Sequence, residues 1–279
     1  MTTHGGLPFG GRPFVWTACN VAMLLVFIAA RGAASPLLFV GDFESGSIYP
    51  FITQACCPNS ITVVKSPARH GGFSARFELN YDDDLAAGGK RAEVLRPYDQ
   101  PHDEMNTDYW YGFSVLIPRD WVVESWPEII AQWHDSSLLG LSPPLSLRIE
   151  SDTFILNSRR DGGGVNGDDF WVGPVILAKW VDWVFHVKWS SGPDGMIEVW
   201  QNGQLLVSRN GPSIYSGNPI GPYFKMGLYK WLWNRGQYLL AQKRLIFFDE
   251  FREADHTGSY QVVAPGPPMP PVGLSLEGP

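Results

Sequence analysis

Three short segments of the sequence carry polar side chains that together could move a proton off and onto a sugar. They are Arg91-Ala92-Glu93, Gln132-Trp133-His134 and Lys225-Met226-Gly227-Leu228-Tyr229. Each segment lies in a stretch that alternates like a β-strand, so its polar residues fall on one face of that strand. The sequence therefore predicts one face on which a base, an acid and several cationic or polar groups gather.

This set of groups suits the cleavage of a uronic acid polymer by β-elimination. Such a reaction must neutralise the sugar carboxylate, remove the weakly acidic C5 proton and protonate the O4 leaving group. Arg91, Gln132 and Lys225 suit the first task, and His134 and Tyr229 suit the two proton transfers. The chemistry itself requires no cofactor.

Each segment also has an ordinary structural interpretation. Gln132 and His134 could be surface residues of an edge strand, and Arg91-Ala92-Glu93 could hold a surface ion pair. Lys225 could extend along the surface beside a half-buried Tyr229. The co-occurrence of all three segments in one chain favours the catalytic interpretation.

Two further positions are candidates for contact with a sugar. Gly227 lies between Lys225 and Tyr229 on the same strand face, where the missing side chain would let a ligand approach the backbone. His70, in the turn Arg69-His70-Gly71-Gly72, is a weaker candidate for sugar binding.

The composition indicates one all-β domain. The chain has 279 residues, 44% of them hydrophobic and 14% aromatic, enough for a large core. Short alternating runs are separated by Gly, Pro, Asn and Asp, a pattern typical of a β-sandwich. Asn202-Gly203 joins two such runs and predicts a hairpin with a type I′ turn. The predicted strands, besides the three segments above, are Ser60–Val64, Phe73–Leu79, Tyr109–Ile117, Leu145–Glu150, Phe154–Ser158, Trp183–Trp189, Met196–Gln201, Leu205–Arg209 and Leu245–Arg252.

The two ends of the chain differ from the rest. An apolar run from Val15 to Ala30 follows Arg12 and precedes small residues at Gly32 and Ala34, which predicts a signal peptide over residues 1–34 and a secreted protein. The predicted domain covers residues 35–262. Residues 263–279 are rich in Pro and Gly, which indicates a disordered tail.

The charge narrows the range of partners. Removing residues 1–34 takes away Arg12 and Arg31 and no acidic residue, so the formal charge moves from −7 to −9. Without a basic surface, nucleic acid binding is not expected, and a densely sulfated polymer is a poor match. We expect a monomer without a membrane segment after signal cleavage, acting on an acidic polysaccharide.

Two local features have structural interpretations. Cys56 and Cys57 are adjacent and could form a vicinal disulfide, bridge to another chain or stay reduced. Asp161–Asp169 reads as a flexible loop that could cover a groove, and it lacks the spacing of a calcium-binding loop.

The chain resembles a known enzyme family over roughly residues 39 to 253. Arg91-Ala92-Glu93-Val94-Leu95-Arg96, Tyr109-Trp110-Tyr111-Gly112-Phe113-Ser114, Gln132-Trp133-His134 and Tyr223-Phe224-Lys225-Met226-Gly227-Leu228-Tyr229 are similar, in the same order, to blocks of the heparin lyase I and glucuronan lyase group of polysaccharide lyases. The pattern is more distantly similar to that of alginate lyases, which have Ser at the position of Ala92.

The resemblance implies a concanavalin-like β-jelly-roll whose concave sheet forms the substrate groove. It also implies that His134 and Tyr229 are the proton-transfer pair and that Arg91, Gln132 and Lys225 bind and neutralise the substrate. Jelly rolls of this kind include calcium-binding members, so Glu44 and Asp249, near the two ends of the domain, are candidate ligands of a structural Ca²⁺.

We expect a glucuronan-like polymer as the substrate, because the acidic chain disfavours heparin and its many Trp residues suit stacking on unsulfated sugars. Alginate or a heparin-type polymer is the alternative substrate, and a non-catalytic carbohydrate-binding module is the alternative function. In a β-1,4-linked glucuronate, the C5 hydrogen and O4 lie on the same side of the ring. Tyr229 could therefore serve as both base and acid, or His134 could be the base and Tyr229 the acid.

Overall fold

The structure is a computed structural model. It describes residues 1–3, 5, 35–97, 103–136, 140–164, 167–236 and 240–266. The chain divides into two units, Met1–Ala34 and Ser35–Pro279. Nearly all of the predicted signal peptide lies outside the described residues, so its cleavage stays a prediction. Within the described part of the chain, no helix has the length and hydropathy needed to cross a bilayer.

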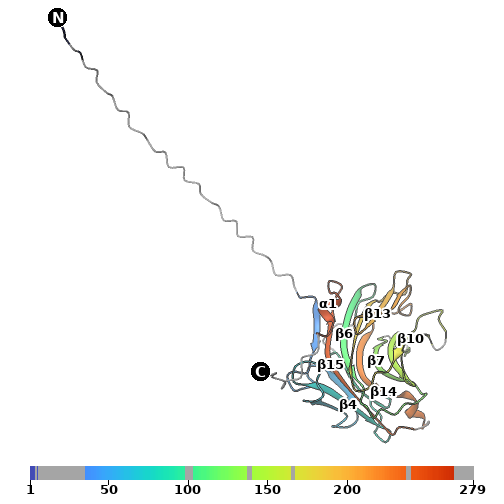
Figure 1. Cartoon of the computed structure of the whole chain (residues 1–279). Helices are drawn as coiled ribbons and strands as arrows, with labels where there is room; N and C mark the ends of the chain where they lie inside the picture. Colours follow the sequence, from blue (N-terminus) through green and yellow to red (C-terminus); the bar gives the residue numbers. More distant parts are fainter. Residues whose placement is uncertain are drawn as a thin grey trace, which may run out of the picture. The chain divides into compact units, whose positions relative to one another are not determined.

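The domain is a sandwich of two antiparallel sheets with a jelly-roll arrangement. Within the described ranges, the first sheet has eight strands in the order β13-β12-β11-β6-β15-β4-β3, with β1 also paired to β15, and the second has seven in the order β10-β9-β8-β7-β14-β5-β2. Figure 1 shows β6 beside β15. The strands of the first sheet are β1 (Leu37–Gly41), β3 (Ile61–Val64), β4 (Ser74–Asn80), β6 (Asp108–Leu116), β11 (Trp180–Lys188), β12 (Met196–Gln201), β13 (Gln204–Asn210) and β15 (Lys243–Ala254). Those of the second sheet are β2 (Ile52–Ala55), β5 (Arg91–Leu95), β7 (Glu128–His134), β8 (Leu145–Glu150), β9 (Thr153–Ser158), β10 (Asp168–Pro174) and β14 (Tyr223–Tyr229).

Alternation of side chains explains how the strands bury one face. In β11, Trp183, Phe185 and Val187 are fully buried in the core between the sheets. The strand that follows, β12, turns into β13 through Asn202 and Gly203, which have φ angles of 48° and 83°. Both residues therefore adopt the left-handed conformation of the type I′ turn that the sequence predicts.

Aromatic contacts across the core hold the two sheets together. The ring of Trp133 on β7 lies 4.6 Å from that of Phe185 on β11, centroid to centroid. Phe224 on β14 stacks on Phe251 of β15 with centroids 4.7 Å apart. Burying one such side chain contributes roughly 1.5–3 kcal/mol. These contacts fix β7 and β14, the strands that present His134 and Tyr229.

Most of the strand predictions are confirmed within one to three residues, and Leu145–Glu150 and Met196–Gln201 have their predicted bounds. The three strands that sequence reasoning missed are β1, β2 and β10. The predicted loop Asp161–Asp169 is shorter than expected, because Asp168 and Asp169 pair with β9 as the start of β10. Residues 165 and 166 of this loop lie outside the described residues.

The C-terminal boundary of the domain falls later than predicted. Helix α1 (Tyr260–Val263) places Val263, which is fully buried, against the outer face of the first sheet. The carbonyl oxygen of Val263 lies so close to Gly112 that a Cβ there would be 2.0 Å away. This packing keeps Val263 in the fold although the residues after it are rich in Pro and Gly. Residues 267–279 of the predicted tail lie outside the described residues.

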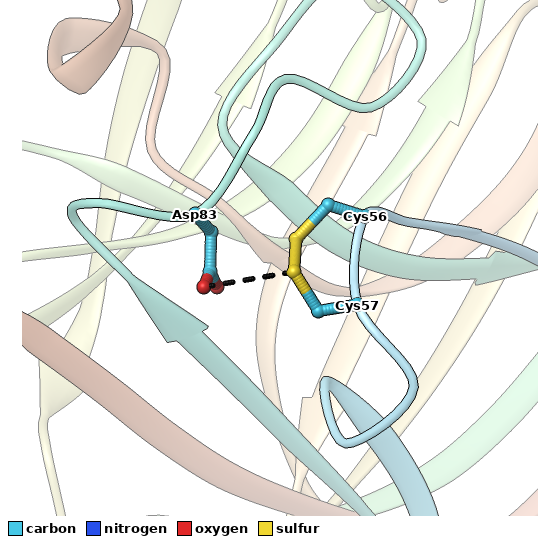
Figure 2. Close-up of side chains that lie close together, drawn as sticks. All are labelled: Cys56, Cys57 and Asp83. Carbon is cyan, nitrogen blue, oxygen red and sulfur yellow. Dashed lines mark hydrogen bonds between the residues drawn. A yellow bond between two sulfur atoms is a disulfide. The ribbon is translucent and has the colours of Figure 1, made fainter.

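Cys56 and Cys57 form a vicinal disulfide, which is one of the three states the sequence allowed. Figure 2 shows the carboxylate of Asp83 facing this disulfide, with Oδ1 3.8 Å from the sulfur of Cys57. A disulfide sulfur carries no hydrogen to donate, so the contact is not a hydrogen bond. Asp83 instead accepts a hydrogen bond from the Asn80 amide at 2.8 Å, which holds the turn after β4.

Candidate active site

The outer face of the second sheet is hollowed into a cleft of about 710 Å³. Its floor comes from β5, β7, β8, β10 and β14, and its rim from residues 140–143 and the 3₁₀ helix η1 (Trp231–Arg235). The volume is that of a typical small-molecule or oligosaccharide site. Four predicted site residues line this cleft: Arg91, Gln132, His134 and Tyr229.

The strand register explains why these residues meet. Tyr229 on β14 pairs with Arg91 on β5 and, on its other side, with Ile129 on β7. Lys225 pairs in the same way with Gln132. Paired residues point to the same side of a sheet, so residues far apart in the sequence converge on one face.

Glu93 is buried beneath the cleft and connects three of the predicted residues. Its Oε2 accepts a hydrogen bond from Arg91 Nη1 at 3.0 Å and lies 3.8 Å from Lys225 Nζ. Its Oε1 accepts a hydrogen bond from the Gln132 amide. Arg91 and Lys225 therefore share one compensating anion, which lets two cations remain buried side by side.

Lys225 lies in the sheet rather than in the cleft lining. Its Nζ donates a hydrogen bond to Gln54 Oε1 at 2.7 Å, and this oxygen is also 3.5 Å from Arg91 Nη1. Burial lowers the pKa of Lys225, while the attraction of Glu93 opposes that shift. Lys225 thus lies beneath the cleft, whereas Arg91 is among the residues that line it.

Two buried polar atoms of cleft-lining residues have no hydrogen-bond partner among the described residues. They are Arg91 Nε, a donor, and Gln132 Oε1, an acceptor. Buried polar groups are normally hydrogen-bonded, because an unsatisfied group is unfavourable. A carboxylate could accept from Arg91 and a sugar hydroxyl could donate to Gln132, so the pair has the polarity of a uronate site.

His134 is held in the form of a base. Its Nδ1 lies 2.8 Å from the carbonyl oxygen of Asp135, which can only accept, so Nδ1 carries the proton and Nε2 has the free lone pair. Burial lowers the pKa of His134, and the nearby charge of Lys225 lowers it further. The ring is therefore neutral at neutral pH and can accept a proton at Nε2.

Tyr229 is placed between a cation and the open cleft. The guanidinium carbon of Arg91 lies 4.0 Å from the centroid of its ring. Gly89 also packs so closely against the ring that a Cβ there would be 2.7 Å from Tyr229 Cε2. Among the described residues, the Tyr229 hydroxyl has no hydrogen-bond partner. The ring is thus fixed while its hydroxyl stays available to a ligand.

Gly227 does not leave space for a ligand, contrary to the expectation from the sequence. Its φ is +135°, and a Cβ would lie 2.2 Å from the carbonyl oxygen of Ala92 on the neighbouring strand. The register of β14 and β7 shifts between Met226 and Tyr229, which marks a bulge at this point. Glycine is needed there because β5 approaches closely.

His70 is not brought to the cleft. It lies in the turn before β4, where its Nδ1 is 3.9 Å from Glu250 of β15, in the first sheet. A role in sugar binding would need a separate site on that sheet, and nothing in the arrangement of the described residues supports one.

Glu44 and Asp249, the candidate calcium ligands, are both hydrogen-bonded to backbone amides of the turn at residues 69–73. Glu44 accepts hydrogen bonds from the amides of Gly72 and Phe73, the shortest at 2.9 Å, and Asp249 accepts them from Arg69 and other amides, the shortest at 2.8 Å. Burial also raises the pKa of Asp249 to about 7. Both carboxylates fit the task of fixing the turn at residues 69–73. The calcium hypothesis stays a prediction that a titration can test.

A family model described as "Polysaccharide lyase" matches residues 42–252. The chain belongs to the polysaccharide lyase family. As a polysaccharide lyase it is an enzyme, so the alternative of a non-catalytic binding module is set aside. No curated protein sequence matches the chain significantly.

Solved structures share the fold of this polysaccharide lyase at low sequence identity. An endo-β-1,4-glucuronan lyase from Trichoderma reesei superposes with a TM-score of 0.68 at 16% identity, covering 83% of this chain and 99% of that chain. The alginate lyase A1-II′, of polysaccharide lyase family 7, gives a TM-score of 0.55 at 13% identity over 73% of this chain and 93% of its own. The cellulose-induced protein Cip1 gives 0.53 at 15% identity, with coverages of 77% and 96%.

Sequence reasoning missed two groups that line the cleft of this lyase, Arg148 and Trp231, and also Gln54, which accepts a hydrogen bond from Lys225. Gln54 lies on the unpredicted strand β2, and Trp231 lies on a 3₁₀ helix of one short turn. Arg148 falls in a correctly predicted strand, Leu145–Glu150, where it alternates with apolar residues and shares the polar face with Ser146 and Glu150. That polar face was the available signal.

Proposed function

We propose that this polysaccharide lyase cleaves a β-1,4-linked glucuronan-like polymer by β-elimination. The observation that carries the proposal is the joint placement of His134, Tyr229 and Arg91 in one cleft, with Arg91 Nε and Gln132 Oε1 unsatisfied. A neutral base, a free phenol and an available guanidinium are the groups that elimination next to a carboxylate requires.

In the proposed reaction, Arg91 binds the carboxylate of the reacting sugar and Gln132 Oε1 accepts from one of its hydroxyls. Lys225 adds positive potential from below, which stabilises the negative charge that grows on the carboxylate as the C5 proton leaves. The electron pair of the C5–H bond forms the C4=C5 double bond, the C4–O4 bond breaks, and O4 takes a proton.

His134 Nε2 is proposed as the base, because its lone pair is free and burial keeps the ring neutral. Tyr229 is proposed as the acid that protonates O4. Both side chains line the same cleft, as the same-side geometry of the C5 hydrogen and O4 in a β-1,4-linked glucuronate demands. If Tyr229 carried out both transfers, His134 would serve only to hold the substrate, and the pH profile below separates the two schemes.

Glucuronan is favoured over alginate by one observation and over heparin by two others. The chain superposes on the glucuronan lyase with a TM-score of 0.68 and on the alginate lyase A1-II′ with a lower TM-score of 0.55. The formal charge of −9 without residues 1–34 opposes the binding of a densely sulfated polymer such as heparin. Trp231 at the cleft offers an aromatic face to an unsulfated ring.

The substrate panel tests the proposal directly. Purified residues 35–279 are incubated with glucuronan, alginate, heparin and hyaluronan, and the ultraviolet absorbance of the unsaturated uronate is followed. We expect the highest kcat/KM with glucuronan. A faster reaction with alginate would show that the proposed substrate is wrong and that the proposed type of reaction is right. If none of the polymers gave an absorbance change, the proposal that the enzyme cleaves uronates by elimination would be refuted.

We also propose that the enzyme is secreted as a monomer after cleavage behind Ala34, because residues 1–34 have the composition of a signal peptide. Mass spectrometry of the exported protein tests the cleavage site, and light scattering tests the oligomeric state. A mature N-terminus at Ser35 and the mass of one chain are the expected results.

A further inference from the structure

Arg148 occupies the opposite end of the cleft from Arg91. The strand register places Arg91, Tyr229, Ile129 and Arg148 in one row across β5, β14, β7 and β8. All four line the cleft. Three strand spacings separate the two arginines along this row, or about 14 Å between their strands. A linked pyranose unit is about as long as one strand spacing, so a chain bound along the row would reach both guanidinium groups with different sugars.

Arg148 is oriented by neutral groups. Its Nε donates to Ser146 Oγ at 3.0 Å, and its Nη2 donates to Asn157 Oδ1 at 2.6 Å. Its guanidinium carbon lies 5.5 Å from the centroid of the Trp231 ring. These contacts fix the plane of the guanidinium without an ion pair.

Three other arginines, which are buried and held by hydrogen bonds, differ from Arg148 because each forms an ion pair with a carboxylate. Arg91, Arg96 and Arg244 form ion pairs with Glu93, Glu253 and Glu124 at 3.0, 2.6 and 2.8 Å. Arg148 is partly buried and forms no ion pair within 4.0 Å among the described residues. An oriented guanidinium without a carboxylate, inside a cleft, is suited to receive one from a ligand.

Charges of both signs surround Arg148, with Arg159 on one side of the balance and Asp169 and Glu150 on the other. Arg159 Nε donates to the same Asn157 Oδ1 at 3.1 Å, so two guanidinium groups converge on one amide oxygen. Burial, followed by the repulsion of Arg159, lowers the pKa of Arg148 to about 10, which leaves it charged at neutral pH. Asp169 is engaged by Asn157 Nδ2 at 2.6 Å. Glu150 and Asp169 also line this end of the cleft, where they could accept hydrogen bonds from sugar hydroxyls.

Trp231 joins the two ends of the row. Its ring lies 6.1 Å from that of Tyr229, centroid to centroid, and 5.5 Å from the guanidinium carbon of Arg148. A sugar that stacks on Trp231 would therefore be next to the reacting unit on one side and close to Arg148 on the other.

We infer that Arg148 binds the carboxylate of a second uronate of the same polymer, outside the reacting unit. Ser146 and Asn157 position its guanidinium, and Trp231 supports the sugar ring. This inference rests on the proposed function and deepens it, because it makes the enzyme selective for consecutive uronates. A polymer in which uronates alternate with neutral sugars would present its second carboxylate at a different distance from the first.

The test compares Arg148→Gln with the wild type on a disaccharide-to-hexasaccharide series of oligoglucuronides. We expect kcat/KM on the long oligomers to fall about tenfold or more, mainly through KM, because a charge-assisted hydrogen bond is lost in ground and transition states alike. The shortest cleavable oligomer should show little change. Arg148→Lys, which keeps the charge, should recover part of the loss. Arg76→Gln is the matched control, since Arg76 pairs with Glu78 on the first sheet and lies outside the cleft.

A measurement of binding tests this inference independently of the proposed function. Calorimetry with hexaglucuronate is carried out on Tyr229→Phe and on Tyr229→Phe combined with Arg148→Gln. A tenfold weaker affinity in the combined variant supports the Arg148 site even if the wild type proves inactive as a glucuronan lyase. The inference would be overturned if the two variants bound hexaglucuronate with equal affinity or did not bind it at all. It would also be overturned if Arg148→Gln lost the same factor of kcat/KM on oligomers of every length.

Discussion

The guanidinium of Arg91 lies 4.0 Å from the ring centroid of Tyr229, and the two residues are direct partners in the register of β5 and β14. A sugar carboxylate bound by Arg91 is thereby placed next to the phenol that would protonate the neighbouring O4. In the proposed reaction, the pairing of β5 with β14 therefore sets the distance between the cation that binds the carboxylate and the acid that protonates O4.

Glu93→Gln is expected to destabilise the protein and to impair catalysis. The substitution keeps the shape of the side chain but leaves Arg91 and Lys225 without their shared anion. Breaking a buried ion pair on one side typically destabilises by about 3–5 kcal/mol. Urea denaturation measures the loss, with Glu198→Gln on the first sheet as the partly exposed control. Equal stability of the two variants would contradict the central role of Glu93.

Gly227→Ala is expected to be far more destabilising than Gly88→Ala. Both glycines have positive φ, which disfavours alanine by about 1–2 kcal/mol. A Cβ at Gly88 meets nothing within 4 Å, whereas one at Gly227 would lie 2.2 Å from the Ala92 carbonyl oxygen. We expect Gly227→Ala to lose about 3 kcal/mol or more, or not to fold. Similar unfolding midpoints for the two variants would show that β5 can move away.

Local patterns predict much of this structure because the strands that carry the chemistry alternate regularly. The faces of β7 and β14, and the type I′ turn at Asn202-Gly203, follow from period-two alternation and turn chemistry. Strand β2 (Ile-Thr-Gln-Ala) was missed because it lacks the run of β-branched residues that marks β3 (Ile-Thr-Val-Val), a strand of the same length. Its Gln54 lies 171 positions from Lys225, and no local pattern can reveal that the two share a hydrogen bond.

The rest of the site depends on packing between distant segments. The bulge at Gly227 arises from the pairing of β14 with its neighbours, so the sequence alone suggested an opening for a ligand instead. Glu44 and Asp249 are carboxylates near the two ends of the domain, a pattern that in the sequence suggests a cation site. The structure shows that both carboxylates accept hydrogen bonds from amides of residues 69–73. Arg148 was visible as a charged residue on the polar face of a predicted strand, but its position opposite Arg91 is a property of the register.

The rate should depend on pH through His134. The pKa of His134 is lowered, so the ring stays neutral, and active as a base, to a pH below its ordinary value of 6.5. As the pH falls through this lowered pKa, Nε2 takes up a proton and kcat/KM should fall with it. A profile of kcat/KM against pH checks this. An acidic limb with its midpoint above 6.5 would be inconsistent with the buried, cation-flanked environment of His134, and an unchanged limb in His134→Gln would assign it to another group.

Calcium is expected to have little effect on stability or rate. Glu44 and Asp249 are occupied by backbone amides, and the raised pKa of Asp249 reduces its charge near neutral pH. Thermal unfolding and initial rates are measured with added calcium and with a chelator. A rise in Tm with calcium that is lost in Glu44→Gln would establish the metal site that the arrangement of these amides disfavours.

Tyr229→Phe tests the central claim most directly. The substitution removes one hydroxyl and almost no packing volume, so Tm and hexaglucuronate affinity should stay close to those of the wild type. Loss of a positioned acid or base lowers the rate by about 10²–10⁴-fold. The measurement compares equal amounts of the wild type and of Tyr229→Phe acting on glucuronan. The quantity measured is kcat for the formation of the unsaturated product, which absorbs ultraviolet light. We predict a fall in kcat within that range with KM nearly unchanged, and a kcat within a factor of about two of the wild type would remove the phenol from the mechanism.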